Sequence, residues 1–112
     1  MLSYDRSRKR AAQLKAVRRQ AGYMQLKHEL WEDKDGLFTF VLSGPMGEEA
    51  RSQIAPGARM IWEVEANSHF EAMTLYYQRM GWGRYTTEHE WDYQPYPLEW
   101  WQKQNPGKEP PK

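Results

Sequence analysis

The chain has 112 residues and no cysteine, which excludes disulfides, thiolate zinc sites, iron–sulfur clusters and cysteine nucleophiles. Its 39% hydrophobic residues, with six Trp, seven Tyr and three Phe, suit one compact domain with an aromatic core. No apolar run approaches the ~20 residues that span a bilayer, and no apolar stretch follows the basic N-terminus, so we expect a soluble, cytoplasmic protein.

The net charge of +1 hides a strong asymmetry along the chain. Residues 1–28 contain eight Lys or Arg and one acid, a net charge of +7. Residues 29–112 contain eight basic and fourteen acidic residues, a net charge of −6. This division predicts a basic arm that contacts an acidic body, within one molecule or across a dimer.

Residues 1–24 are expected to form this arm, as a basic helix over about residues 3–21 that ends near Gly22. Its apolar stripe is narrow, so the helix needs a docking surface or a partner. We considered a protein partner, a nucleic-acid backbone and a targeting peptide, and favour the protein partner. The basic residues expected to make these contacts are Arg6, Arg8, Lys9, Arg10, Lys15, Arg18 and Arg19.

Two strands joined by a hairpin are expected next. Alternation from Tyr23 to Trp31 predicts the first strand, and Asp35-Gly36 predicts the turn. The return strand, residues 37–42, is apolar on both faces, which places it at the centre of the sheet. Residues 48–59 are expected to form a loop with a short helix, closed by a turn at Pro56-Gly57.

The strongest local pattern lies between Met60 and Gly83. Alternation up to Ala66 predicts a third strand. Ser68 followed by Glu71 is a capping box, in which the Ser hydroxyl accepts from the amide of Glu71 and the carboxylate reaches back to the amide of Ser68. A helix with apolar residues three and four apart should follow and end at Gly81.

The C-terminal segment from Arg84 is rich in aromatic residues, which disordered chains lack. We expect it to pack along the domain in extended form, with Pro95 and Pro97 holding it straight, a helical turn over residues 98–102 beginning at Pro97, and a frayed end. Large aromatic rings are typical of interfaces. The aromatic residues expected to contact a partner are Trp91, Tyr93, Tyr96, Trp100 and Trp101.

Chemical motifs are weak throughout. The three histidines, His28, His69 and His89, lack metal-ligand spacing and are expected to face solvent or make single hydrogen bonds. Glu63 and Glu65 could act as an acid pair, but they are better explained as the polar face of a sheet. No nucleophile elbow or phosphate loop is present, and no stretch carries a family signature. We therefore expect no catalytic, cofactor or metal site.

These patterns predict a small α+β protein: a three-stranded antiparallel sheet with one helix packed on it, a basic N-terminal helix and an aromatic-rich extended C-terminal segment. The expected parts are the arm at 1–24, a compact core at 25–94 and a Pro/Trp-rich strap at 95–112. The leading functional hypothesis is a non-enzymatic interaction module or accessory subunit that binds another protein or itself. The alternative is a nucleic-acid-binding accessory protein that uses the basic arm.

Overall fold

A computed structural model describes residues 25–110, and the predicted basic arm lies outside these residues. The described chain is a small α+β fold with a three-stranded antiparallel sheet, as predicted. The strands are β1 (Leu26–Glu32), β2 (Phe38–Leu42) and β3 (Arg59–Ala66). The helices are α2 (Glu48–Ser52), α3 (His69–Met80) and α4 (Leu98–Gln104), with short 3₁₀ helices η1 (Pro45–Gly47) and η2 (Glu90–Tyr93). None of the helices in this part of the chain has the length and apolar character needed to cross a bilayer.

The strand order is β2-β1-β3, so β1 is central and β2 is an edge strand. The prediction of a central β2 was therefore wrong. The alternation of β2 misled because both of its faces meet other elements. Phe40 faces α3 and stacks on Tyr76 at 4.6 Å, while Val41 on the opposite face is buried. In the same region, the guanidinium of Arg51 in α2 lies 4.0 Å from the carboxylate of Glu29, which is the partner of Val41 in the β1–β2 pairing.

The β1–β2 hairpin turns where the sequence predicts it. Gly36 adopts a positive φ of 79°, which a residue without a Cβ tolerates. The carboxylate of Asp33 accepts from the amides of Asp35 at 2.9 Å and Leu37 at 3.0 Å. These bonds satisfy backbone donors that the turn leaves unpaired.

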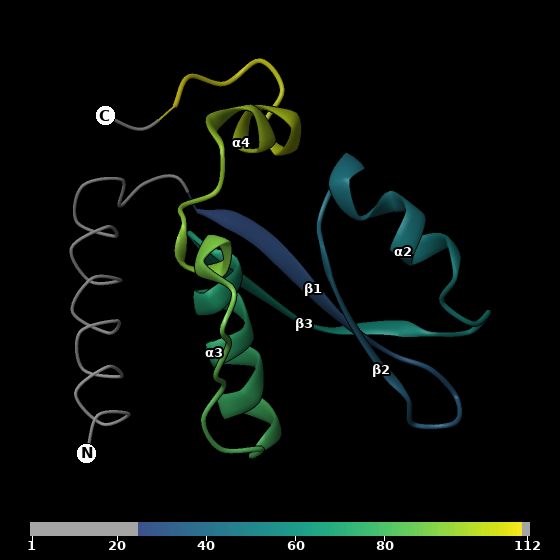
Figure 1. The fold of residues 1–112 in the computed structure, drawn as a ribbon. Helices are drawn as coiled ribbons and strands as arrows, with labels where there is room; N and C mark the ends of the chain where they lie inside the picture. The colour runs from purple at the N-terminus through teal and green to yellow at the C-terminus, as the bar shows by residue number, and fades with distance from the viewer. Residues whose placement is uncertain (1–24, 111–112) are drawn as a thin grey trace, which may run out of the picture.

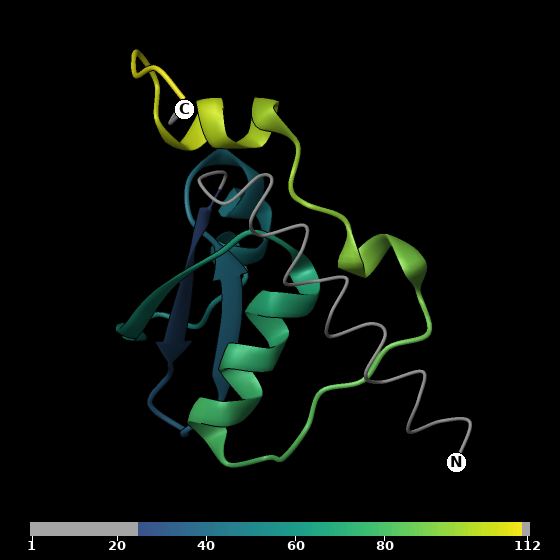
Figure 2. The ribbon, with the colours of Figure 1, turned by 90° about the vertical axis from the view of Figure 1, so that its left-hand side faces the viewer.

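The β3–α3 unit also follows its prediction. Ser68 is the N-cap of α3 and its hydroxyl accepts from the amide of Glu71 at 3.1 Å. The Glu71 carboxylate accepts from the amide of Asn67 at 3.0 Å, one residue earlier than a standard capping box predicts. Gly81 ends the helix in the left-handed region, with φ of 71°. α3 covers one face of the sheet (Figures 1 and 2).

The C-terminal segment runs back along α3 and ends in α4, which lies at the end of the sheet where β1 begins (Figures 1 and 2). Tyr85 and Tyr93 contact Phe70 of α3 at ring distances of 5.8 and 4.5 Å. The amide of Tyr96 then donates to the carbonyl of Asn67 at 2.8 Å. Pro97 is the N-cap of α4 rather than its first helical residue, because its ψ of 145° is extended. The segment thus joins the N-terminal end of α3 to the sheet.

Candidate functional site

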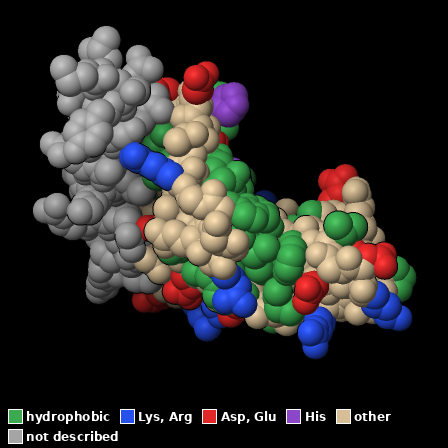
Figure 3. Space-filling view, turned by 90° about the horizontal axis from the view of Figure 1, so that it is seen from below, with side chains coloured by type: hydrophobic (Ala, Val, Ile, Leu, Met, Phe, Trp, Pro, Cys, Tyr) green, Lys and Arg blue, Asp and Glu red, His purple; other side chains and the backbone are tan. Residues whose placement is uncertain are grey.

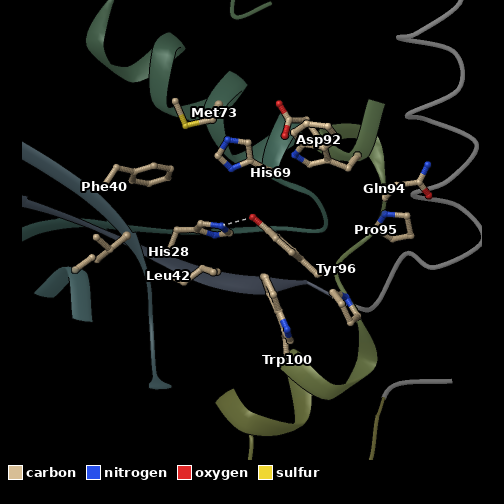
Figure 4. Close-up of a pocket in the computed structure, with 14 residues that line it drawn as sticks. His28, Phe40, Leu42, His69, Met73, Asp92, Gln94, Pro95, Tyr96 and Trp100 are labelled. Atoms are coloured by element: carbon tan, nitrogen blue, oxygen red, sulfur yellow. Dashed lines mark hydrogen bonds between the residues drawn. The ribbon is translucent and has the colours of Figure 1, made fainter. Parts of the chain in front are cut away.

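A pocket of about 630 Å³ lies between the sheet, α3 and the C-terminal segment. Figure 4 shows side chains from β1, β2, α3 and the segment before α4 converging on it. Its volume falls within the ~300–1,000 Å³ range of ligand-binding pockets. The residues that line it are His28, Phe40, Val41, Leu42, Ala50, His69, Met73, Trp91, Asp92, Gln94, Pro95, Tyr96, Pro97 and Trp100.

His28 is the buried polar group on the sheet side of the pocket. Leu26, His28 and Leu30 occupy one face of β1, so the imidazole lies within the apolar face and is only 3% exposed. Its Nδ1 lies 3.0 Å from the carbonyl oxygen of Leu26, and its Nε2 lies 2.8 Å from the hydroxyl of Tyr96. Because a carbonyl only accepts, Nδ1 carries the proton and Nε2 accepts from the Tyr96 hydroxyl.

Both members of this pair favour their neutral forms. Burial lowers the pKa of His28 from 6.5 to about 4, against the opposing effect of its backbone hydrogen bonds. Burial also raises the pKa of Tyr96 well above 10, and the negative charges of Glu71 and Asp92 raise it further. Near pH 7 the pocket therefore contains a neutral imidazole and a neutral phenol in a direct hydrogen bond.

A row of rings continues from this pair along one side of the pocket. His28 stacks on Phe40 at 5.4 Å between ring centres and contacts Tyr96 at 5.6 Å. Tyr96 in turn stacks on Trp100 of α4 at 5.7 Å. Such ring contacts stabilise by ~0.5–1.5 kcal/mol beyond the area they bury, so each ring helps to position the next.

Other residues line the pocket opposite this row (Figure 4). His69 and Met73 come from α3, and Asp92 comes from η2. Asp92 is only 6% exposed, and its carboxylate accepts from the hydroxyl of Thr87 at 2.7 Å. His69 is exposed, and its ring meets the edge of Tyr85 at 6.4 Å. The pocket thus has a buried carboxylate within an otherwise largely apolar lining.

The aromatic residues predicted to contact a partner divide into two groups. Trp91, Tyr96 and Trp100 line the pocket. Tyr93 and Trp101 are buried, at 7% and 8% exposure, and belong to the core of the domain. The seven basic residues predicted for the arm, Arg6 to Arg19, lie outside the described residues.

His28 differs from its predicted environment, whereas His69 and His89 are exposed as predicted. His28 was expected to face solvent or make a single hydrogen bond, yet it is buried and bonded through both ring nitrogens. His89 is exposed and stacks on Trp91 at 4.4 Å. Within residues 25–110, no three His, Cys, Asp or Glu side chains form a group that could hold a metal ion. Glu63 and Glu65 are exposed on β3, as the polar-face interpretation predicts.

The hydrogen bond between His28 and Tyr96 was not predicted, because 68 residues separate them in the chain. The available signal was a histidine at a position of β1 where the alternation calls for an apolar residue. No family model, curated protein or solved structure matches this chain. The function is therefore argued from the chemistry of the pocket.

Proposed function

We propose that this protein is a non-enzymatic interaction module whose pocket receives a side chain from a segment of a protein partner. One observation carries the proposal: Trp91, Tyr96 and Trp100 line the same pocket as residues of the sheet and α3. Pockets that combine rigid aromatic side chains with a few polar groups are typical binding sites. The aromatic rings supply contact area, and the sheet and α3 hold them in place.

The exposure around the pocket favours a partner larger than the pocket itself. Trp91 lines the pocket and is 67% exposed, and Leu98, directly after the lining residue Pro97, is 42% exposed. Large apolar side chains outside the pocket gain stabilisation only from a ligand that extends across them. A polypeptide segment can fill the pocket with one side chain and cover these residues with its neighbours.

The protonation states in the pocket favour binding over catalysis. A general acid or base works best with a pKa near the operating pH. The pKa of His28 is lowered to about 4 and that of Tyr96 is raised above its usual value of 10, so both pKa values lie further from pH 7 than those of an ordinary histidine and tyrosine. A neutral, buried hydrogen-bonded pair of this kind supports a role in positioning and recognition.

The basic residues of the N-terminus are a predicted second contact. Residues 25–110 contain eight basic and fourteen acidic residues, so a basic segment of a second copy is one form that the partner can take. Light scattering after gel filtration tests this: a dimer at low salt that dissociates at high salt supports it. A gel shift that is abolished by deletion of residues 1–20 would instead favour nucleic acid as the partner of the arm.

Peptide selection against the purified full chain tests the proposal. Random peptides displayed on phage should yield binders that share one or more large side chains. Their affinity should fall about tenfold or more for the Trp91→Ala variant, the loss of ~1.4 kcal/mol or more expected when an aromatic contact is removed. Trp82→Ala is the matched control, because Trp82 is 53% exposed and does not line the pocket.

Selected peptides that bind the Trp91→Ala variant as well as the native protein would contradict the proposal. The same conclusion follows if the Trp82→Ala variant loses binding instead. Figure 3 shows that hydrophobic side chains gather on the face of the molecule seen from below. The exposed large apolar residues of the described chain that do not line the pocket are Leu37, Phe38, Met60, Trp82 and Leu98.

A further inference from the structure

The inner polar groups of the pocket present hydrogen-bond acceptors to a ligand. His28 uses its Nδ1 proton on the carbonyl of Leu26, and its Nε2 accepts the proton of the Tyr96 hydroxyl. The Tyr96 hydroxyl has no second proton to donate, so toward any other partner its oxygen acts only as an acceptor. The buried carboxylate of Asp92 is likewise an acceptor.

The carboxylate charges around the pocket come from Asp92 and Glu71. Asp92 lines it, and the charges of Asp92 and the buried Glu71 both act on the Tyr96 hydroxyl. The lining contains no Lys or Arg among the residues that the structure describes. The buried imidazole of His28 is neutral near pH 7, so it adds no positive charge. A ligand group that enters this environment is stabilised if it is positive and repelled if it is negative.

The remaining polar side chains of the lining do not alter this preference. His69 and Gln94 are exposed, so water screens the charge of His69, which acts on His28, and can satisfy the hydrogen bonds of both side chains. Much of the remaining lining is apolar and includes Phe40, Leu42 and Met73. A bound group therefore needs an apolar stem as well as a polar end.

We infer that the pocket binds the alkylammonium side chain of a lysine carried by the partner segment. The methylene stem packs against the apolar and aromatic side chains, and the ammonium donates toward the Tyr96 hydroxyl and the Asp92 carboxylate. An ammonium has three donors and no acceptor, which matches the acceptors present. Aromatic rings attract a nearby cation as well. This inference rests on the proposed function and names the side chain that the pocket selects.

Three capped tripeptides test it with the native chain: acetyl-Gly-Xaa-Gly-amide in which Xaa is lysine, trimethyl-lysine or norleucine. Lysine has both the charge and the N–H donors, trimethyl-lysine keeps only the charge, and norleucine has neither. NMR titration of the indole N–H signal of Trp100, at millimolar peptide, measures all three affinities. We expect lysine to bind about tenfold more tightly than norleucine, with trimethyl-lysine between them, since a hydrogen bond to a charged group is stronger than one between neutral groups.

A pair of substitutions locates the source of the preference. Asp92→Asn should remove most of the advantage of lysine over norleucine and leave the affinity for norleucine unchanged. Glu99→Gln is the matched control, because it removes the same charge from an exposed position beside Trp100. Equal losses in the two variants would show a general field effect and overturn the inference.

The outcomes separate this inference from the proposed function. If norleucine binds as tightly as lysine, the pocket is a side-chain site without a cationic preference, and the lysine inference fails alone. If trimethyl-lysine binds more tightly than lysine, the N–H donors are irrelevant and the inference is also wrong. If none of the three peptides changes the Trp100 signal, the lysine inference fails, and phage selection with the Trp91→Ala variant decides the proposed function separately.

Discussion

The side-chain amide of Gln104, near the end of α4, forms two hydrogen bonds with the backbone of Lys27 in β1. Its Oε1 accepts from the Lys27 amide at 2.8 Å, and its Nε2 donates to the Lys27 carbonyl at 2.9 Å. Nε2 also lies 2.9 Å from the carbonyl of Ser43, just after β2. The Ser43 amide still donates to the Lys27 carbonyl at 3.0 Å, so the Gln104 side chain bridges Lys27 and Ser43 just beyond the end of β2 and ties α4 to the sheet.

Gln104→Ala should destabilise the protein, because it leaves the Lys27 amide and two carbonyls without these partners. Because water can reach these groups, loss of a hydrogen bond of this kind costs ~0.5–1.5 kcal/mol, and for a domain of this size each kcal/mol lowers Tm by roughly 4–8 °C. Thermal unfolding measures the change. Gln102→Ala, an exposed residue of the same helix, is the control and should leave Tm nearly unchanged. Equal effects of the two substitutions would refute a specific role for Gln104.

Protonation of His28 should limit stability in acid. Its pKa is lowered from 6.5 in the unfolded chain to about 4 in the folded one, so the unfolded state binds the proton first as the pH falls. Stability is therefore fully present above pH 6.5 and decreases between pH 6.5 and about pH 4. The shift corresponds to a loss of roughly 3 kcal/mol.

Urea unfolding of the native chain and of His28→Gln over this pH range measures the effect. The variant has no imidazole to protonate, so the difference in unfolding free energy between the two proteins should shrink as the pH falls from 6.5 to 4. A constant difference across this range would show that His28 titrates normally in the folded protein.

Tyr96 should limit stability at the alkaline end. Its pKa is raised in the folded protein, so the unfolded chain loses the phenolic proton first as the pH rises above 10. The free energy of unfolding should therefore decline above pH 10. This decline should be smaller in the Tyr96→Phe variant, which has no phenol at this position. Ultraviolet titration of the phenolate provides an independent readout: burial also raises the pKa values of Tyr76 and Tyr85, so the number of tyrosines that ionise only on unfolding should be one lower in the variant than in the native protein.

The cap of α3 should contribute measurably to stability. Ser68 is fully buried and its hydroxyl accepts from Glu71, so Ser68→Ala should cost about 1 kcal/mol. Gly81 has a φ of 71° and nothing within 4 Å of the position of a Cβ. Gly81→Val should therefore cost more than Ser68→Ala, through backbone strain rather than steric clash. An unchanged unfolding midpoint for Ser68→Ala would mean that the hydroxyl does not stabilise the helix start.

Local parts of the fold were predictable from the sequence because their signals lie within a few residues of one another. The cap at Ser68, the helix end at Gly81 and the turn at Gly36 each depend on neighbours in the chain. The position of β2 was not predictable in this way. The apolar residues on both faces of β2 indicate that both faces are covered. A strand covered by helices on both faces has the same pattern whether it lies at the centre or at the edge of the sheet.

The aromatic part of the pocket was predictable from the sequence, but its polar pair was not. The aromatic content of the C-terminal segment indicated contacts, and three of the five chosen residues line the pocket. Tyr93 and Trp101 have the same chemistry but pack into the core, and composition does not distinguish these roles. The His28–Tyr96 pair forms because the C-terminal segment lies beside β1, where the Tyr96 amide also donates to the carbonyl of Asn67 between β3 and α3, and no local pattern encodes these contacts.

The most direct test of the binding site is the location of the NMR signals that move when the lysine tripeptide is added. We expect the methyl signal of Met73, the ring signals of His28 and the indole signal of Trp100 to shift together with one common affinity, since all three residues line the pocket. The indole signal of Trp82 should stay in place. Shifts confined to Trp82 and the hairpin around Leu37, with Met73 and Trp100 unmoved, would contradict the account.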